Sequence, residues 1–179
     1  RVIFCDAAIC GQNNGCCMSP SVAAIRSDPL RYARVEVIST SNVVLASGYT
    51  NNDGMYNIVV PSGNVRVRVY AETQNPVIRV KDNRNSDATY TVVSPEASVS
   101  ALSVTASTNH DISITSGWNG TSYGSARLSG PFAILGTLHR VSKRLVENRN
   151  SAPALPTLDV VWHVDNANDF TLDLATGKL

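Results

Sequence analysis

The sequence predicts a mainly β protein, an antiparallel β-sandwich followed by a C-terminal extension of one helix and further strand. The 179 residues are 43% hydrophobic and only 16% charged, a composition typical of β-rich extracellular proteins. Several short segments alternate apolar and polar residues between frequent turns, as strands of a sandwich do. After residue 130 the apolar spacing changes to three or four residues, which indicates a helix.

Residues 1–30 have no sustained period, so we expect an irregular arm held by its own cysteines. All cysteines of the chain lie here: Cys5, Cys10, Cys16 and Cys17. Their even number and clustering predict two local disulfides. A bond between the adjacent Cys16 and Cys17 would be strained, which leaves the pairings 5–16 with 10–17 or 5–17 with 10–16. A four-cysteine metal site is the alternative, although zinc sites usually contain two separated pairs.

The first four residues, Arg1, Val2, Ile3 and Phe4, are short and apolar enough to act as an assembly arm. Such a segment can add as a strand to a neighbouring subunit. The alternative is that it packs on its own domain.

Residues 31–115 are expected to form the sandwich domain. The predicted strands cover residues 33–38, 64–70, 76–81, 89–93, 101–105 and 111–115. The clearest of them places Val65, Val67 and Val69 on one face and the intervening arginines on the other. We therefore expect these valines in the core.

Residues 116–130 are rich in Gly, Ser and Asn and predict a loop at a domain boundary. A helix is expected over residues 131–147 within an extension that covers residues 131–179, with Ser129 as N-cap. Its apolar stripe consists of Phe132, Leu135, Leu138, Val141 and Leu145, and its polar side carries Arg140, Lys143 and Arg144. Two further strands are predicted over residues 158–164 and 170–174.

The run G-Y-T-N-N-D-G-M-Y-N-I-V-V-P at residues 48–61 predicts a strand end, a tight turn and a second strand. Tyr56, Ile58 and Val60 would then face the core. The run resembles the carboxypeptidase regulatory-like domain, a transthyretin-like and Ig-like β-sandwich, and the resemblance covers about residues 31–93. It implies a structural or binding module without catalytic residues.

Residues 127–163 resemble the segment that leads into zinc-peptidase-like domains of some large secreted bacterial proteins. The similarity rests on the expected helix and on the run A-P-A-L-P-T-L-D-V-V-W. Those proteins carry H-E-x-x-H later in the chain, and this sequence has no such motif. The resemblance therefore transfers no peptidase activity.

Other motifs give no catalytic or metal site. Ser122 lies in a G-x-S-x-G run at residues 120–124, but a nucleophile elbow needs a strand directly before it and a helix directly after it. His110, His139 and His163 are far apart in sequence and are expected on different elements, whereas zinc ligands must converge. We expect a turn at Ser122, and neither catalysis nor a bound metal.

A cluster of oxygen-bearing side chains near the C-terminus comprises Asp165, Asn166, Asn168 and Asp169. It resembles half of a calcium loop but lacks the Gly and the distal Glu, so a solvated turn is the better interpretation. Asn119 begins an N-x-[ST] sequon whose glycosylation depends on the host. The sequence contains no Gly-rich phosphate loop or dinucleotide fingerprint, so no cofactor is expected.

The net charge and the hydropathy of the sequence limit the classes of partner that we expect. A net charge of +1 gives no reason to expect nucleic acid or an anionic membrane, and no apolar run approaches the roughly 18–20 residues that span a bilayer. Because there is no initiator Met or signal peptide, we expect a processed mature form or an excised piece.

We expect a secreted or cell-surface, non-catalytic structural or adhesive module that self-associates or binds a protein partner. An open strand edge is expected between Ser94 and Ser116, where little charge protects it. The alternative is the non-catalytic N-terminal portion of a larger secreted hydrolase, most plausibly a zinc metallopeptidase. Carbohydrate binding through Trp118, Tyr123 and Trp162 is a further possibility.

Overall fold

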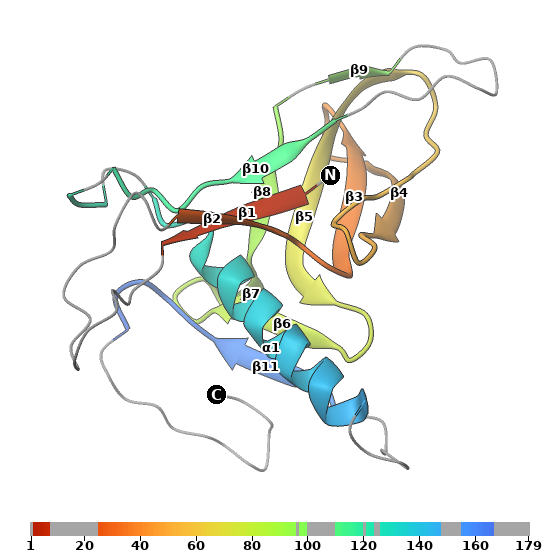
Figure 1. Cartoon of the computed structure of the whole chain (residues 1–179). Coiled ribbons are helices and arrows are strands. Elements are labelled where there is room, and N and C mark those ends of the chain that lie inside the picture. Colours follow the sequence, from red (N-terminus) through yellow and green to blue (C-terminus); the bar gives the residue numbers. More distant parts are fainter. Residues whose placement is uncertain are drawn as a thin grey trace, which may run out of the picture.

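A computed structural model describes residues 2–7, 25–95, 97–99, 110–119, 121–123, 126–147 and 155–166, and the prediction of a mainly β fold with one helix is confirmed for these residues. The strands form a three-stranded and an eight-stranded sheet, and a helix lies beside them (Figure 1). In the part of the chain described, no helix is long and apolar enough to cross a bilayer.

The small sheet has the order β10-β1-β2. It contains β1 (Val2–Ala7), β2 (Ile25–Pro29) and β10 (Ile112–Ile114). β1 is antiparallel to β2 and parallel to β10. This differs from the irregular arm expected before residue 31, because the backbone at both of its ends pairs with other strands.

The large sheet has the order β11-β6-β5-β3-β4, with three short strands paired beside this path. The main strands are β3 (Ala33–Ser39), β4 (Val44–Tyr49), β5 (Gly63–Thr73), β6 (Ile78–Asp82) and β11 (Leu158–Val161). β7 (Ala88–Thr89) pairs with β6, whereas β8 (Thr91–Val93) and β9 (Ala97–Val99) pair with β5. Every pair is antiparallel except β6 with β11, which is parallel. The strands predicted over residues 101–105 and 170–174 lie outside the described residues.

The structure corrects the prediction for the segment after the turn at residues 51–54. It was expected to be a strand, yet residues 55–61 belong to none. β5, and not this segment, lies next to β3. Tyr56 and Ile58 are nevertheless packed against the core, and the Tyr56 hydroxyl donates to the His110 carbonyl at 2.7 Å. Val60 is only partly buried.

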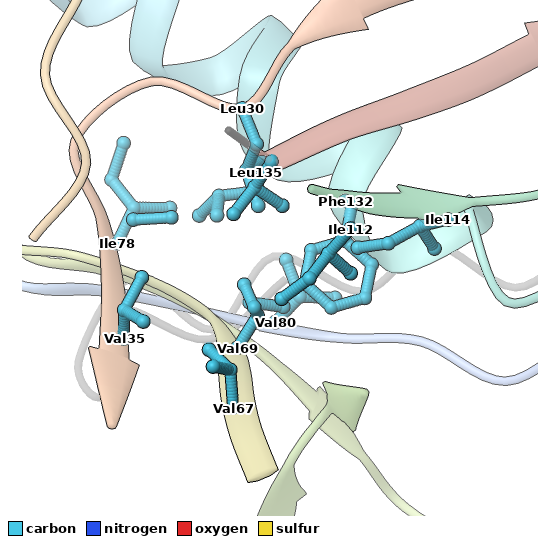
Figure 2. Packing of buried hydrophobic residues seen from close by; sticks show 13 residues of the cluster. Leu30, Val35, Val67, Val69, Ile78, Val80, Ile112, Ile114, Phe132 and Leu135 are labelled. Atoms are coloured by element: carbon cyan, nitrogen blue, oxygen red, sulfur yellow. The ribbon is translucent and has the colours of Figure 1, made fainter. Parts of the chain in front are cut away.

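The core is formed where the sheets and the helix meet (Figure 2). Val67 and Val69 are buried, as is Val65, whereas Arg66 and Arg68 are partly exposed, so the predicted alternation along β5 is confirmed. The small sheet contributes its own apolar side chains: Val2, Ile112 and Ile114. Residues far apart in sequence thus share one apolar interior.

The helix α1 (Gly130–Glu147) begins as the sequence predicts. Ser129 is buried, and its carbonyl accepts the Ala133 N–H at 2.8 Å, the first bond of the helix. Phe132 and Leu135 pack in the core.

The second half of α1 differs from the expected stripe. Val141 and Leu145 are each 51% exposed. Among the described residues, buried helix side chains occur only up to His139, because the helix continues past the strands it covers (Figure 1).

Candidate functional site

The strongest candidate site is the open edge of the large sheet, formed by β4. β4 is the last strand in the sheet order and pairs with β3 alone among the described strands. It lies at the opposite end of the sheet from β11 (Figure 1). An unpaired edge offers backbone N–H and C=O groups to another chain.

The direction of these backbone groups follows from the pairing with β3. The Thr50 N–H donates to the Ala33 carbonyl at 2.9 Å, so Thr50 faces β3. Residues of an antiparallel strand alternate between facing their partner and facing away. Gly48 therefore also faces β3, whereas Ser47 and Tyr49 direct their N–H and C=O groups to the open edge. No backbone hydrogen bond joins these groups to another described loop.

The side chains of this edge are apolar and uncharged. Val43, Val44, Leu45 and Tyr49 are 60%, 48%, 39% and 39% exposed. Residues 41–50 contain no charged residue and no proline. Charges and prolines are the usual means by which proteins protect an edge strand, so the chemistry of β4 favours association.

A bulge at one end of β4 limits the regular part of the edge. Val37 pairs with Ala46 and Ile38 pairs with Val44, which leaves Leu45 as the extra residue. Bulges bend and twist a strand locally. The four residues after it remain in continuous register with β3, so the open edge is regular at its centre.

The end of β4 is fixed by local contacts. The Asn51 side-chain oxygen accepts the backbone N–H groups of Asp53 and Met55, both at 2.9 Å. Ile58 lies against Gly48, where an added Cβ would be 3.3 Å from its Cγ1 atom. A rigid edge binds an added strand with less loss of conformational entropy than a mobile loop would.

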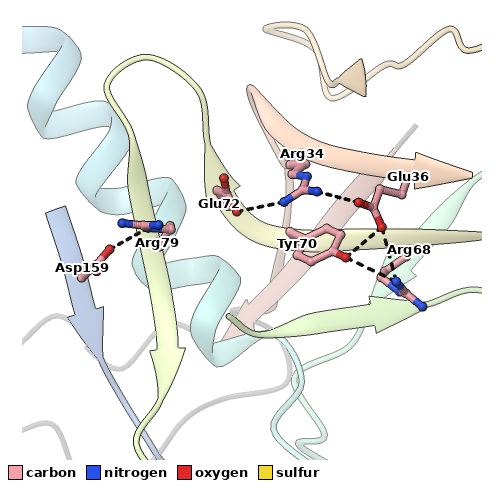
Figure 3. A network of polar contacts seen from close by, with 7 residues as sticks. All are labelled: Arg34, Glu36, Arg68, Tyr70, Glu72, Arg79 and Asp159. Atoms are coloured by element: carbon pink, nitrogen blue, oxygen red, sulfur yellow. Dashed lines mark hydrogen bonds and ion pairs between the residues drawn. The ribbon is translucent and has the colours of Figure 1, made fainter. Parts of the chain in front are cut away.

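Four charged side chains beside this edge compensate one another (Figure 3). Glu36 is only 4% exposed, and its carboxylate accepts from Arg34 at 2.6 Å, Tyr70 at 2.8 Å and Arg68 at 3.3 Å. Arg34 also pairs with Glu72 at 3.5 Å. Burial alone would lower the pKa of Arg34, but Glu36 and Glu72 outweigh it and raise that pKa. Arg34 therefore keeps its charge, and Arg34 and Arg68 are paired with Glu36 and Glu72 in one cluster.

A groove of about 190 Å³ is a smaller candidate site. Its apolar lining includes Tyr90, Val92, Leu128, Phe132 and Trp162. The Tyr90 hydroxyl donates to the Trp162 carbonyl at 2.9 Å, and burial, followed by the charge of a nearby aspartate, raises the pKa of Tyr90 to about 12. The groove can take an apolar group.

The structure places Ser122 in a turn beside Trp118 and Tyr123, which form an isolated bridge. Its described side-chain partner is Asn119, at 3.4 Å, and no helix begins directly after it within the described residues. The arrangement is not a nucleophile elbow. Asn119, the sequon residue, also accepts two backbone N–H groups of this turn with its side-chain oxygen.

The three histidines lie on different elements, as expected. His139 is buried in α1 and packs on Tyr32 with ring centroids 5.0 Å apart. His163 lies 3.6 Å from Asp165 after β11, and His110 precedes β10. Among the described residues no three His, Cys, Asp or Glu side chains are grouped to hold a metal ion.

The acidic and amide cluster after β11 is described only in part. Asp165 forms an ion pair with Arg84 at 3.1 Å, and the Asn166 side chain accepts from Asn83 at 3.1 Å. Both side chains thus contact the turn between β6 and β7. Asn168 and Asp169 lie outside the described residues.

The aromatic residues considered for carbohydrate do not form one platform. Trp118 and Tyr123 pack edge to face with centroids 5.0 Å apart, and Arg127 covers the Tyr123 ring at 4.1 Å. Trp162 packs instead on Tyr90 at 5.7 Å. Carbohydrate binding stays a prediction.

The structure places part of the N-terminal assembly arm within its own domain. Val2 is fully buried, its N–H donates to Gly54 at 2.8 Å, and its carbonyl accepts from Leu30 at 2.9 Å. Ile3 and Phe4 lie in β1 with their backbones paired to β2 and β10, and Arg1 is outside the described residues. For Val2 the structure thus agrees with the alternative to the assembly arm, in which the N-terminal segment packs on its own domain.

The two disulfides expected among the cysteines stay a prediction. Cys5 belongs to β1 by its backbone, and Cys10, Cys16 and Cys17 lie outside the described residues.

The sequence pattern did not identify β4 as an edge strand, and the open edge was expected between Ser94 and Ser116 instead. Of that stretch, residues 96 and 100–109 lie outside the described part, and β10 is an outer strand of the small sheet. The uncharged run at residues 41–50 was the available signal, because an edge without charge is unusual.

Comparisons with protein-family models, with curated proteins and with solved structures give no match for this chain.

Proposed function

We propose that this chain is a secreted or cell-surface, non-catalytic binding module that associates with protein partners by strand addition at β4. The proposal rests on the observation that Ser47 and Tyr49 direct their backbone N–H and C=O groups outward from an edge strand without charged residues. Backbone hydrogen bonds would supply affinity, and the exposed Leu45 and Tyr49 would select alternate side chains of the added segment. The partner is therefore an extended, predominantly apolar protein segment.

The resemblance to the carboxypeptidase regulatory-like domain supports the same proposal. We infer a transthyretin-like sandwich in which the two sheets enclose the common core. The buried residues of both sheets and the compensated charges of β3 and β5 fit a structural scaffold. A scaffold of this kind presents a rigid edge and needs no catalytic residue.

A selection experiment tests the proposal. Random ten-residue peptides would be selected on the immobilised chain, and the binders measured against Ser47→Pro and Ser47→Ala variants. Proline removes the outward N–H without removing a bond to β3, and edge strands tolerate it; alanine keeps that N–H. We expect binding to survive Ser47→Ala and to fall at least about tenfold in Ser47→Pro. Peptides that bind both variants equally would contradict the proposed edge.

A second candidate is the non-catalytic N-terminal portion of a larger secreted hydrolase, most plausibly a zinc metallopeptidase. The favouring observation is the exposed apolar side of the second half of α1, formed by Val141, Leu145 and Val146. A following domain would cover such a surface. The complete precursor sequence decides this point, because an H-E-x-x-H motif downstream of Leu179 would favour the hydrolase.

A further inference from the structure

The geometry of β4 points to a specific partner, and we propose that β4 pairs antiparallel with β4 of a second copy of this chain about a two-fold axis at Ser47. This inference rests on the proposed function, since it names the occupant of the same edge. It joins two large sheets into one continuous sheet across the axis.

The first argument is the symmetry of the exposed side chains. Leu45 and Tyr49 lie two positions before and two positions after Ser47, and each is 39% exposed. In an antiparallel pair centred on Ser47, Ala46, Ser47 and Gly48 are in regular register, and Leu45 of each copy, the bulged residue at the end of this stretch, comes next to Tyr49 of the other. Aliphatic–aromatic pairs of this kind stabilise a sheet, and the arrangement forms the contact twice.

The second argument is the direction of the backbone at the centre. The Ser47 N–H and C=O face the open edge, so Ser47 of each copy exchanges two hydrogen bonds with the other across the axis. The neighbouring Ala46 and Gly48 carry no bulky side chain. The close approach of the two copies therefore requires no side-chain rearrangement at the centre.

The third argument is electrostatic. A symmetric interface brings every charge close to a copy of itself, and like charges opposite each other destabilise a strand pair. Residues 41–50 contain no charge. Glu36, which lies across from Ser47 within one copy, is held by Arg34 and Arg68. Self-pairing at β4 thus places no charge of residues 41–50 opposite a copy of itself.

A charge-exchange experiment tests the pairing and its centre. Sedimentation velocity would be measured for the wild type, Ser47→Ala, Ser47→Lys, Ser47→Glu and an equal mixture of the two charged variants. We expect the wild type and Ser47→Ala to form a dimer with rising concentration. Each charged variant alone should dimerise at least about tenfold more weakly, since like charges meet at the axis, and the mixture should recover the dimer.

Circular dichroism of each variant would show that the fold is retained, since Ser47 is exposed. In a mixture of differently labelled wild-type chains, an intermolecular nuclear Overhauser effect between the Leu45 methyl groups and the Tyr49 ring would support the register. Dimerisation unchanged in both charged variants would overturn the inference, and so would a mixture that fails to recover the dimer.

The failure of this inference is distinguishable from the failure of the proposed function. A monomeric wild type that binds selected peptides in a Ser47→Pro-sensitive manner overturns self-pairing and leaves the edge as a site for another protein. A monomeric wild type that binds no such peptide overturns both.

Discussion

Thr50 pairs with Ala33 twice: its N–H donates to the Ala33 carbonyl, and its hydroxyl oxygen accepts the Ala33 N–H, both at 2.9 Å. The same hydroxyl donates to the Leu30 carbonyl at 2.6 Å. Thr50 is only 2% exposed, so water does not replace these bonds. One side chain therefore joins the end of β4 to the start of β3 and to the preceding core residue.

Replacing Thr50 by valine tests this junction. Thr50→Val keeps the shape but leaves the Ala33 N–H and the Leu30 carbonyl buried without a partner, at about 1–3 kcal/mol for each group. Thr50→Ser keeps the hydroxyl and is the matched control. We expect denaturant unfolding to show a large loss for valine and a small one for serine. Equal losses in the two variants would mean that the methyl group and not the hydroxyl matters.

Gly54 is required by its backbone conformation and by its neighbour. Its φ is 70°, and an added Cβ would lie 2.6 Å from the Val2 carbonyl oxygen. Gly63 has a φ of 146° but no atom within 4 Å of an added Cβ. Both alanine variants carry the backbone strain of about 1–3 kcal/mol, but only Gly54→Ala adds a clash. Thermal unfolding should therefore show the greater loss for Gly54→Ala, and the reverse order would contradict the contact with Val2.

Replacing Val2 by alanine distinguishes two possible roles of the N-terminal segment. It is 0% exposed within one chain, so Val2→Ala should reduce the free energy of unfolding by about 1.5–3 kcal/mol. If the arm instead docks on a neighbouring subunit, Val2→Ala should weaken association and leave the stability of the monomer unchanged. Denaturant unfolding together with sedimentation of the same variant distinguishes these results.

Phe132 and Val141 test where α1 leaves the core. Phe132 is 1% exposed and Val141 is 51% exposed. Phe132→Ala should cost about 3–5 kcal/mol through the cavity it creates, whereas Val141→Ala should stay within about 0.5 kcal/mol. A large loss for Val141→Ala in the isolated chain would mean that the second half of the helix is covered.

His139 makes stability depend on pH. Burial lowers the pKa of His139, and the positive charges of Lys143 and Arg31 lower it further. Arg140 and Asp28 lie beside it around a small cavity. The folded chain therefore takes up a proton on His139 at a lower pH than the unfolded chain, whose histidine titrates near about 6.5.

The sign of the effect follows from this difference. Above the unfolded pKa both states are neutral at His139 and the residue adds no pH dependence. As the pH falls below that value, the unfolded state binds the proton first, so the free energy of unfolding decreases until the folded pKa is reached. Denaturant unfolding between neutral and mildly acidic pH should show this decrease. His139→Phe, which keeps a ring against Tyr32, should reduce it, and an unchanged profile would contradict the assignment.

The sequence by itself determined the features that local periodicity encodes. The alternation of Val65, Val67 and Val69 with arginines predicted β5 and its buried face, because successive side chains of a strand point to opposite sides. The spacing of Phe132 and Leu135 predicted the start of α1 in the same way.

Only the tertiary structure decided which surfaces these elements meet. Val141 and Leu145 continue the helical period and yet lie exposed, because α1 continues past the strands that it covers (Figure 1). The position of β4 at the end of the sheet depends on which strands pair with β3, and backbone pairing is similar for most residue types. Local pattern therefore fixes the direction of a side chain, whereas long-range pairing decides whether that direction leads to the core, to solvent or to a second chain.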